Sequence, residues 1–179
     1  MKSLKRIQTM AKVLKILFTI VYVACVVGAI FSMLGLALTP IVANNETLRK
    51  YVLRGGAEFN LNSYLATCIC AVITCGTWFY LGYKNVEFYK YELKTGTPFD
   101  KTVTVSLRKL AFEAIIISCV ANIIEVVICC LFYVEIKDFG VGEIGTGIVY
   151  LLISLILDYG ADLNQEKEKI ENVDDKELN

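Results

Sequence analysis

Four long apolar stretches dominate the pattern of hydrophobic and polar positions along the chain. The first, from Ile16 to Leu38, has 23 residues without a charge. At about 1.5 Å per residue, a helix of that length exceeds the roughly 30 Å hydrocarbon core of a bilayer. The pattern predicts an all-α integral membrane protein, a four-helix bundle with spans at about 14–38, 63–83, 110–134 and 143–160.

Proline and charged residues set the expected ends of these spans. Proline cannot continue the helical hydrogen-bond ladder, so Thr39-Pro40 is expected to end the first helix. The fourth stretch has only 14 uncharged residues, Ile144 to Leu157, and needs its flanking residues to reach spanning length. These ends predict a transmembrane domain over residues 1–163 and an acidic cytoplasmic tail over 164–179.

Two connectors carry helix-start signals. Asn45 is a candidate N-cap for a short helix through Leu53, which would lie on the outer membrane surface. The second span is expected to continue as a helix to Leu93. Asp100 is a candidate N-cap for the helix that opens with residues 101–109.

Lysine and arginine counts predict the orientation. Five lie in the first 15 residues and six between Lys84 and Lys109, against three in the connector 41–62 and one in the connector 135–143. Positive charge is retained in the cytoplasm, so both termini and the middle loop are expected inside.

Composition removes several classes of function. Eighteen basic and 18 acidic residues cancel, so there is no basic field suited to nucleic acid. Histidine is absent, which removes the commonest general base and metal ligand. All seven cysteines lie in apolar stretches, where they are expected to pack as small hydrophobic residues. We expect no cofactor, no metal and no catalytic constellation.

The middle loop is the largest predicted cytoplasmic feature, and two interpretations of it stay open. It anchors the protein on anionic lipid, or it docks a cytoplasmic protein partner. Its six basic residues are Lys84, Lys90, Lys94, Lys101, Arg108 and Lys109.

Glu125 is the first candidate for a proton or ion site, because an acid deep in a transmembrane helix costs on the order of 3 kcal/mol to insert. Asn122 and Ser118 precede it at helical spacing and complete a polar stripe. In one interpretation a neutral Glu125 bonds a neighbouring residue and fixes helix packing. In the other it binds or relays a proton or cation.

Small residues recur at helical spacing in the first span, at Ala24, Gly28, Ser32 and Gly35. Such a face permits close helix approach, either within the chain or against a second copy. The fourth span carries Gly145, Gly147 and Ser154, which also favour close packing.

Two motifs carry a family resemblance. The first is Gly96-Thr97-Pro98-Phe99-Asp100 followed by Leu107-Arg108-Lys109-Leu110, and the second runs from Leu157 to Glu166. They resemble the YoaS-like family of small bacterial membrane proteins of unknown function. The resemblance implies a four-helix protein of the bacterial inner membrane. Genes of that family often lie beside a small regulator, which suits sensing or immunity but supplies no mechanism.

The sequence predicts a non-enzymatic membrane protein that acts through partner or self-association. The alternative is a small oligomeric proton-coupled transporter or exporter that uses Glu125. A membrane-embedded enzyme is a third possibility, for which the sequence offers no motif.

Overall fold

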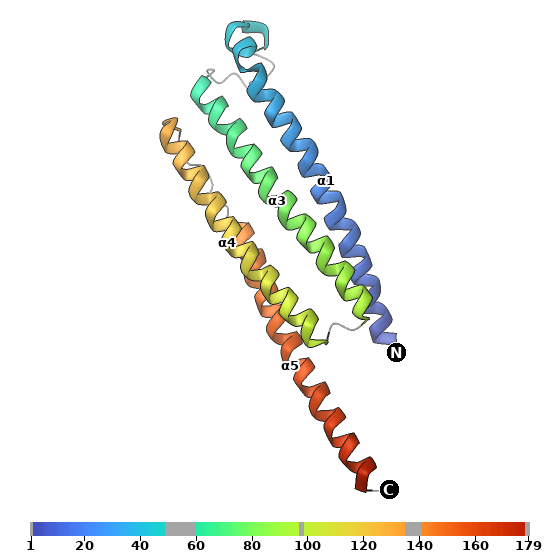
Figure 1. The fold of residues 1–179 in the computed structure, drawn as a ribbon. Coiled ribbons are helices and arrows are strands. Elements are labelled where there is room, and N and C mark those ends of the chain that lie inside the picture. The colour runs from blue at the N-terminus through green and yellow to red at the C-terminus, as the bar shows by residue number, and fades with distance from the viewer. Residues whose placement is uncertain (1, 49–59, 97–98, 135–140, 178–179) are drawn as a thin grey trace. The chain divides into compact units, whose positions relative to one another are not determined.

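Four long helices make up the structure, a computed structural model (Figure 1). They are α1 (Lys2–Asn44), α3 (Leu61–Thr95), α4 (Lys101–Leu131) and α5 (Val141–Glu177). The residues that the structure describes are 2–48, 60–96, 99–134 and 141–177. The predicted all-α architecture is confirmed.

Apolar and polar side chains are distributed as expected for a membrane protein. All four helices are long and apolar enough to cross a bilayer. Phe31 and Ile156 are each 69% exposed, whereas Thr104, Ser118 and Ser154 are fully buried. Burying hydroxyl groups while exposing large apolar side chains is costly in water, but lipid solvates the apolar surface. The chain is therefore a multi-pass helical membrane protein.

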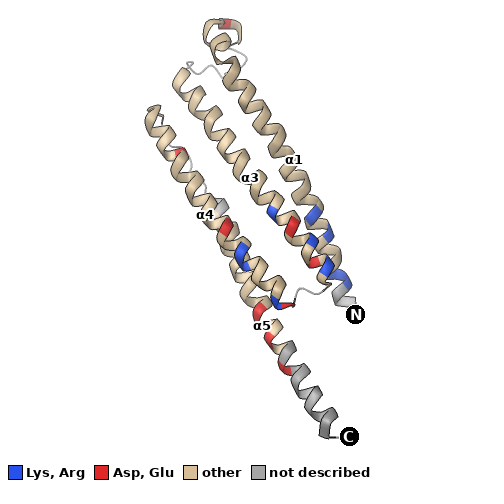
Figure 2. Ribbon diagram, in the orientation of Figure 1, with Lys and Arg blue, Asp and Glu red and all other residues tan. Residues whose placement is uncertain are grey.

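The residues cluster into two compact units, and each is described by itself. Unit 1 comprises residues 1–19, 83–116 and 141–179, and unit 2 comprises residues 20–82 and 117–140. Most of the charged positions coloured in Figure 2 lie in unit 1. Unit 2 is mainly apolar, with Glu46 and Glu125 as the acids among its described residues.

Helix α1 does not end at Thr39-Pro40, and that prediction is wrong. The helix continues to Asn44 with Pro40 inside it. In lipid the chain loses more by leaving the helix than by omitting one hydrogen bond, and nearby hydroxyl groups supply bonds around a proline. Here the Gly35 carbonyl, five residues before the proline, accepts bonds from Thr39 Oγ1 at 3.2 Å and Tyr64 Oη at 3.0 Å.

Asparagine and aspartate side chains cap the helix starts. Asn45 Oδ1 accepts bonds from the backbone N–H groups of Thr47 and Leu48, so a helical segment begins at Glu46 as predicted. Its expected end at Leu53 lies outside the described residues. Asp100 caps α4 as predicted, through Oδ1 and the Thr102 N–H at 2.8 Å. Asn60 caps α3 in the same way, which the sequence analysis did not anticipate.

The helix ends differ from the expected spans by a few residues or more. Helix α3 runs two residues past Leu93 and stops at Gly96, whose φ of 82° suits glycine. Helix α4 ends at Leu131 rather than at residue 134. Helix α5 continues to Glu177, so the stretch 164–177 is helical rather than frayed.

Candidate functional site

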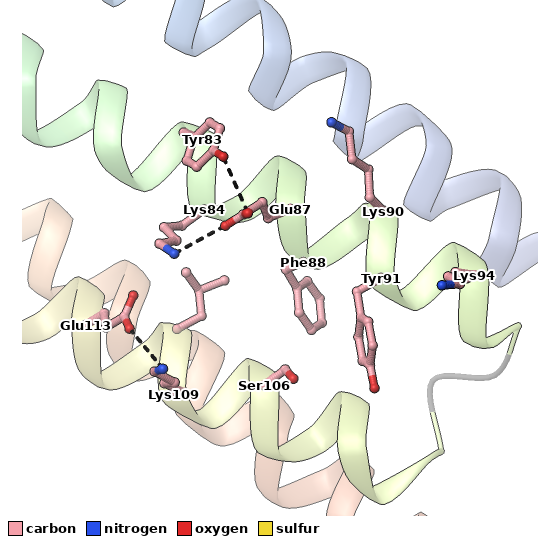
Figure 3. A pocket seen from close by; sticks show the side chains of 11 residues that line it. Tyr83, Lys84, Glu87, Phe88, Lys90, Tyr91, Lys94, Ser106, Lys109 and Glu113 are labelled. Carbon is pink, nitrogen blue, oxygen red and sulfur yellow. Dashed lines mark hydrogen bonds and ion pairs between the residues drawn. The ribbon is translucent and has the colours of Figure 1, made fainter.

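The basic residues of the predicted middle loop lie on helices. The loop proper is short, because α3 ends at Thr95 and α4 begins at Lys101. Within unit 1, these two helices enclose an open pocket of about 560 Å³ (Figure 3). Four of the six predicted basic residues line it. The full lining is Tyr83, Lys84, Glu87, Phe88, Lys90, Tyr91, Lys94, Ser106, Lys109, Leu110 and Glu113.

The pocket lies where both helices change from apolar to charged sequence. On α3 no charge occurs from Leu61 to Tyr83, and Lys84 is the first. On α4 no charge occurs from residue 114 to 124, and Glu113 and Lys109 come immediately before that stretch. Charged side chains next to an uncharged span belong at the headgroup level of a bilayer. The pocket is therefore an interfacial feature.

Short-range pairs organise the charges of the pocket. Lys84 Nζ lies 3.2 Å from Glu87 Oε2, and Tyr83 Oη donates to Glu87 Oε1 at 3.4 Å. Lys109 Nζ lies 4.0 Å from Glu113 Oε1. Four lysines against two glutamates leave the lining with an excess of two positive charges. Within the described part of the chain, Lys90 and Lys94 make no ion pair, and both are exposed.

A chain of hydrogen bonds joins α3 to α4 beside the pocket. Tyr91 Oη donates to Thr102 Oγ1 at 2.8 Å, and Thr102 Oγ1 donates to Asp100 Oδ1 at 2.5 Å. Hydrogen bonds from the Thr102 hydroxyl and then from its backbone N–H lower the pKa of the Asp100 carboxyl. The cap of α4 thereby also holds an aromatic side chain of the pocket in place.

The other two predicted basic residues bind α5. Lys101 Nζ lies 2.9 Å from Asp162 Oδ1, and Arg108 Nη2 lies 2.5 Å from Asp158 Oδ2. These pairs tie two antiparallel helices of unit 1 together. The six residues predicted as one docking surface thus split into four that line the pocket and two that pair with acids of α5.

The predicted polar stripe lies in unit 2, and Glu125 has a partner on a neighbouring helix. Thr74 Oγ1 of α3 lies 2.6 Å from Glu125 Oε1, and the same hydroxyl lies 3.0 Å from the Cys70 carbonyl oxygen. A hydroxyl group has one proton to donate. When Thr74 donates to Cys70, only a protonated Glu125 that donates to Thr74 satisfies the short contact. This arrangement favours the packing interpretation of a neutral Glu125.

Ser118 and Asn122 are buried, at 0% and 7% exposure. Ser118 Oγ makes no hydrogen bond within the described residues. No printed bond joins either side chain to Glu125 among those residues. The stripe is therefore one of shared helical spacing rather than a hydrogen-bonded relay.

The small-residue face of α1 packs within the chain. A methyl group added at Gly28 would lie 3.0 Å from Cys75 Sγ, and one at Gly35 would lie 3.2 Å from Cys68 Sγ. Two glycines seven residues apart thus face two cysteines seven residues apart, in antiparallel register. Ser32 is half-buried and donates to the Gly28 carbonyl. Ala24 is exposed.

Two polar partners had not been anticipated from the sequence. One is Thr74, described above. The other is Asn85, which is 4% exposed and accepts a bond of 2.8 Å from Tyr150 Oη of α5. The only sequence signal was an uncharged amide placed directly after Lys84, where a solvated residue is the ordinary expectation.

Comparisons with family models, with curated proteins and with solved structures give no significant match to this chain. The interfacial pocket and the Thr74–Glu125 contact therefore carry the functional argument.

Proposed function

We propose that the chain is a non-enzymatic membrane protein that acts by association, and that its association surface is the basic interfacial pocket between α3 and α4. The group it takes is acidic. One observation carries the proposal: four lysines gather around an open cavity at the level where two helices leave the membrane. A lysine cluster attracts anionic groups, and each basic residue near an anionic surface contributes about 1 kcal/mol.

The proposed setting is the cytoplasmic face of a bacterial inner membrane, with both termini inside. The support is the excess of lysine and arginine in the first 15 residues and between Lys84 and Lys109. The resemblance to the YoaS-like family agrees with that setting and with a regulatory, sensing or immunity role. The basic pocket then faces the cytoplasmic leaflet.

Site-specific photo-crosslinking in native membranes tests the association. A photoreactive amino acid in place of Lys94, which lines the pocket and is exposed, is expected to give discrete adducts. The matched position is Val105, which is 61% exposed on α4 and does not line the pocket. The adducts at position 94 should disappear when Lys84→Gln and Lys109→Gln are added. Identical adducts at both positions, or adducts indifferent to those changes, contradict the proposal.

A second candidate, an oligomeric proton-coupled transporter, is favoured by one observation. Glu125 lies in an apolar stretch and its carboxyl is held at 2.6 Å from Thr74 Oγ1, as a proton-carrying site requires. Reconstituted protein under a pH gradient would then conduct protons, and Glu125→Gln would abolish the flux. Equal flux in the wild type and in Glu125→Gln would eliminate this candidate while leaving the first intact.

A further inference from the structure

We infer that the pocket between α3 and α4 binds the headgroup of an anionic phospholipid that carries hydroxyl groups as well as a phosphate. The inference rests on the proposed function, because it takes the pocket as the association surface. It adds the chemistry of the partner. The lipid is the occupant for which the lining and its depth argue together.

Depth is the first argument for a lipid. The pocket lies at the headgroup level, as the charge boundaries at Lys84 and Glu113 indicate. Ile116 is 60% exposed and lies one turn deeper than Glu113 on the same face of α4, within unit 1. A headgroup seated in the pocket can therefore leave its acyl chains against apolar helix surface. A soluble anion gains nothing from that surface.

The mixed lining is the second argument. Lysine ammonium groups bind phosphate as point charges. Glu87 and Glu113 repel a bare phosphate, but their oxygens accept hydrogen bonds from the hydroxyl groups of a polyol. Figure 3 shows Lys84 with Glu87 on α3 and Lys109 with Glu113 on α4, around the same opening. A headgroup with a phosphate and neighbouring hydroxyls, as in phosphatidylglycerol, matches both sets of side chains.

The test is lipid binding to the purified full chain in neutral detergent, with bound lipid counted by native mass spectrometry. Dioleoyl phosphatidylglycerol, phosphatidic acid and phosphatidylcholine are titrated separately. We expect phosphatidylglycerol to bind more tightly than phosphatidic acid, and phosphatidylcholine to bind weakest. Glycerol 3-phosphate has the same headgroup chemistry without acyl chains. Displacement of the lipid by millimolar glycerol 3-phosphate would show that the ligand is a soluble phosphate and would overturn the inference.

Two variants assign the binding to the pocket. Lys84→Gln with Lys109→Gln is expected to weaken phosphatidylglycerol binding about 25-fold, since each lysine contributes about fivefold. The charge-matched control, Lys5→Gln with Lys12→Gln, removes two exposed lysines of unit 1 outside the pocket and should change binding less than threefold. Glu113→Gln should reduce the preference for phosphatidylglycerol over phosphatidic acid. Equal weakening in the two double variants overturns the inference.

Thermal unfolding shows whether the variants fold. Both pocket pairs are exposed, and such pairs contribute little to stability, so the melting temperature should stay unchanged. If a variant does not fold, the wild-type lipid preference and its weakening by salt remain decisive. Equal wild-type binding of phosphatidylglycerol and phosphatidylcholine overturns the inference. Charge-dependent protein adducts at position 94 would then still support the proposed function, whereas their absence would remove both.

Discussion

Tyr133 is held in a backbone conformation that suits glycine better. Its φ is 54°, and among the described residues it is the non-glycine residue with positive φ. The Val134 N–H bonds the Cys129 carbonyl at 2.9 Å and the Tyr133 N–H bonds the Cys130 carbonyl at 3.3 Å. This is the Schellman motif, in which the left-handed residue is usually glycine. The side chain is 93% exposed, so it adds little packing within the chain.

We therefore expect Tyr133→Gly to be more stable than Tyr133→Ala by about 1 kcal/mol, because only the backbone preference differs between these variants. Both lose the aromatic ring, so any anchoring of tyrosine at the membrane surface cancels. Unfolding in detergent, followed by circular dichroism, measures the difference. Equal stability of the two variants would mean that the left-handed cap does not form.

Asp100 makes the cap of α4 depend on pH. Hydrogen bonds from Thr102 lower the pKa of this carboxyl below its ordinary value of 3.8. A folded-state pKa that is depressed adds stability above the unfolded pKa, and this stability is lost as the pH falls through the folded value. Asparagine caps equally well and does not titrate there. The wild type should therefore lose melting temperature below about pH 3.8 relative to Asp100→Asn. Parallel pH profiles of the two proteins would contradict this.

At the scale of elements, two glycines of α5 differ sharply in their surroundings. A methyl group added at Gly147 would lie 2.5 Å from Ile115 Cγ1 and 3.1 Å from the Ala111 carbonyl oxygen. Nothing lies within 4 Å of a methyl group at Gly145. Gly147→Ala is expected to destabilise the protein by about 1–3 kcal/mol, because the backbone of α4 must move. Gly145→Ala should be neutral or stabilising by up to about 1 kcal/mol. Melting temperatures in detergent compare the two, and an equal loss would rule out close contact of α4 with α5.

The Thr74–Glu125 contact joins α3 to α4 in unit 2, and its strength can be isolated. In a double-mutant cycle of Thr74→Val and Glu125→Leu, we expect a coupling free energy of about 0.6–1.7 kcal/mol, the range found for hydrogen bonds between transmembrane helices. Glu125→Gln keeps a side-chain acceptor of the same size and should retain most of the stability. A coupling near zero would show that the two side chains do not bond.

The elements were predictable from the sequence where one physical rule acts alone. Span length follows from bilayer thickness, and the caps at Asn45 and Asp100 follow from their side-chain chemistry. The expected break at Pro40 was wrong, because the rule that proline ends helices assumes that water is available to the freed carbonyl. Helix α5 extends beyond residue 163 although its sequence there is polar and gives no span signal.

For the whole molecule, the sequence located the basic residues but not their partners. Which lysines face a cavity and which pair with Asp158 or Asp162 depends on the axial register of α4 against its neighbours. The same holds for Thr74, since its pairing with Glu125 crosses 51 positions of sequence. Hydrophobic periodicity reports which face of a helix is buried, but no local pattern encodes the register between two helices.

Orientation is the property of the whole molecule that the positive charges predict. If lysine and arginine are retained in the cytoplasm, both termini and the turn at Gly96 lie inside, and the stretches after Asn45 and Val134 lie outside. Alkaline phosphatase is active only outside the cytoplasm. Fusions after Asn45 and Val134 should therefore be active, and fusions at Gly96 and the C-terminus inactive, with fluorescent-protein fusions giving the reverse. Activity at Gly96 would put the lysine pocket on the outer face, where positive charge is not retained, and would remove the cytoplasmic setting on which the proposed association depends.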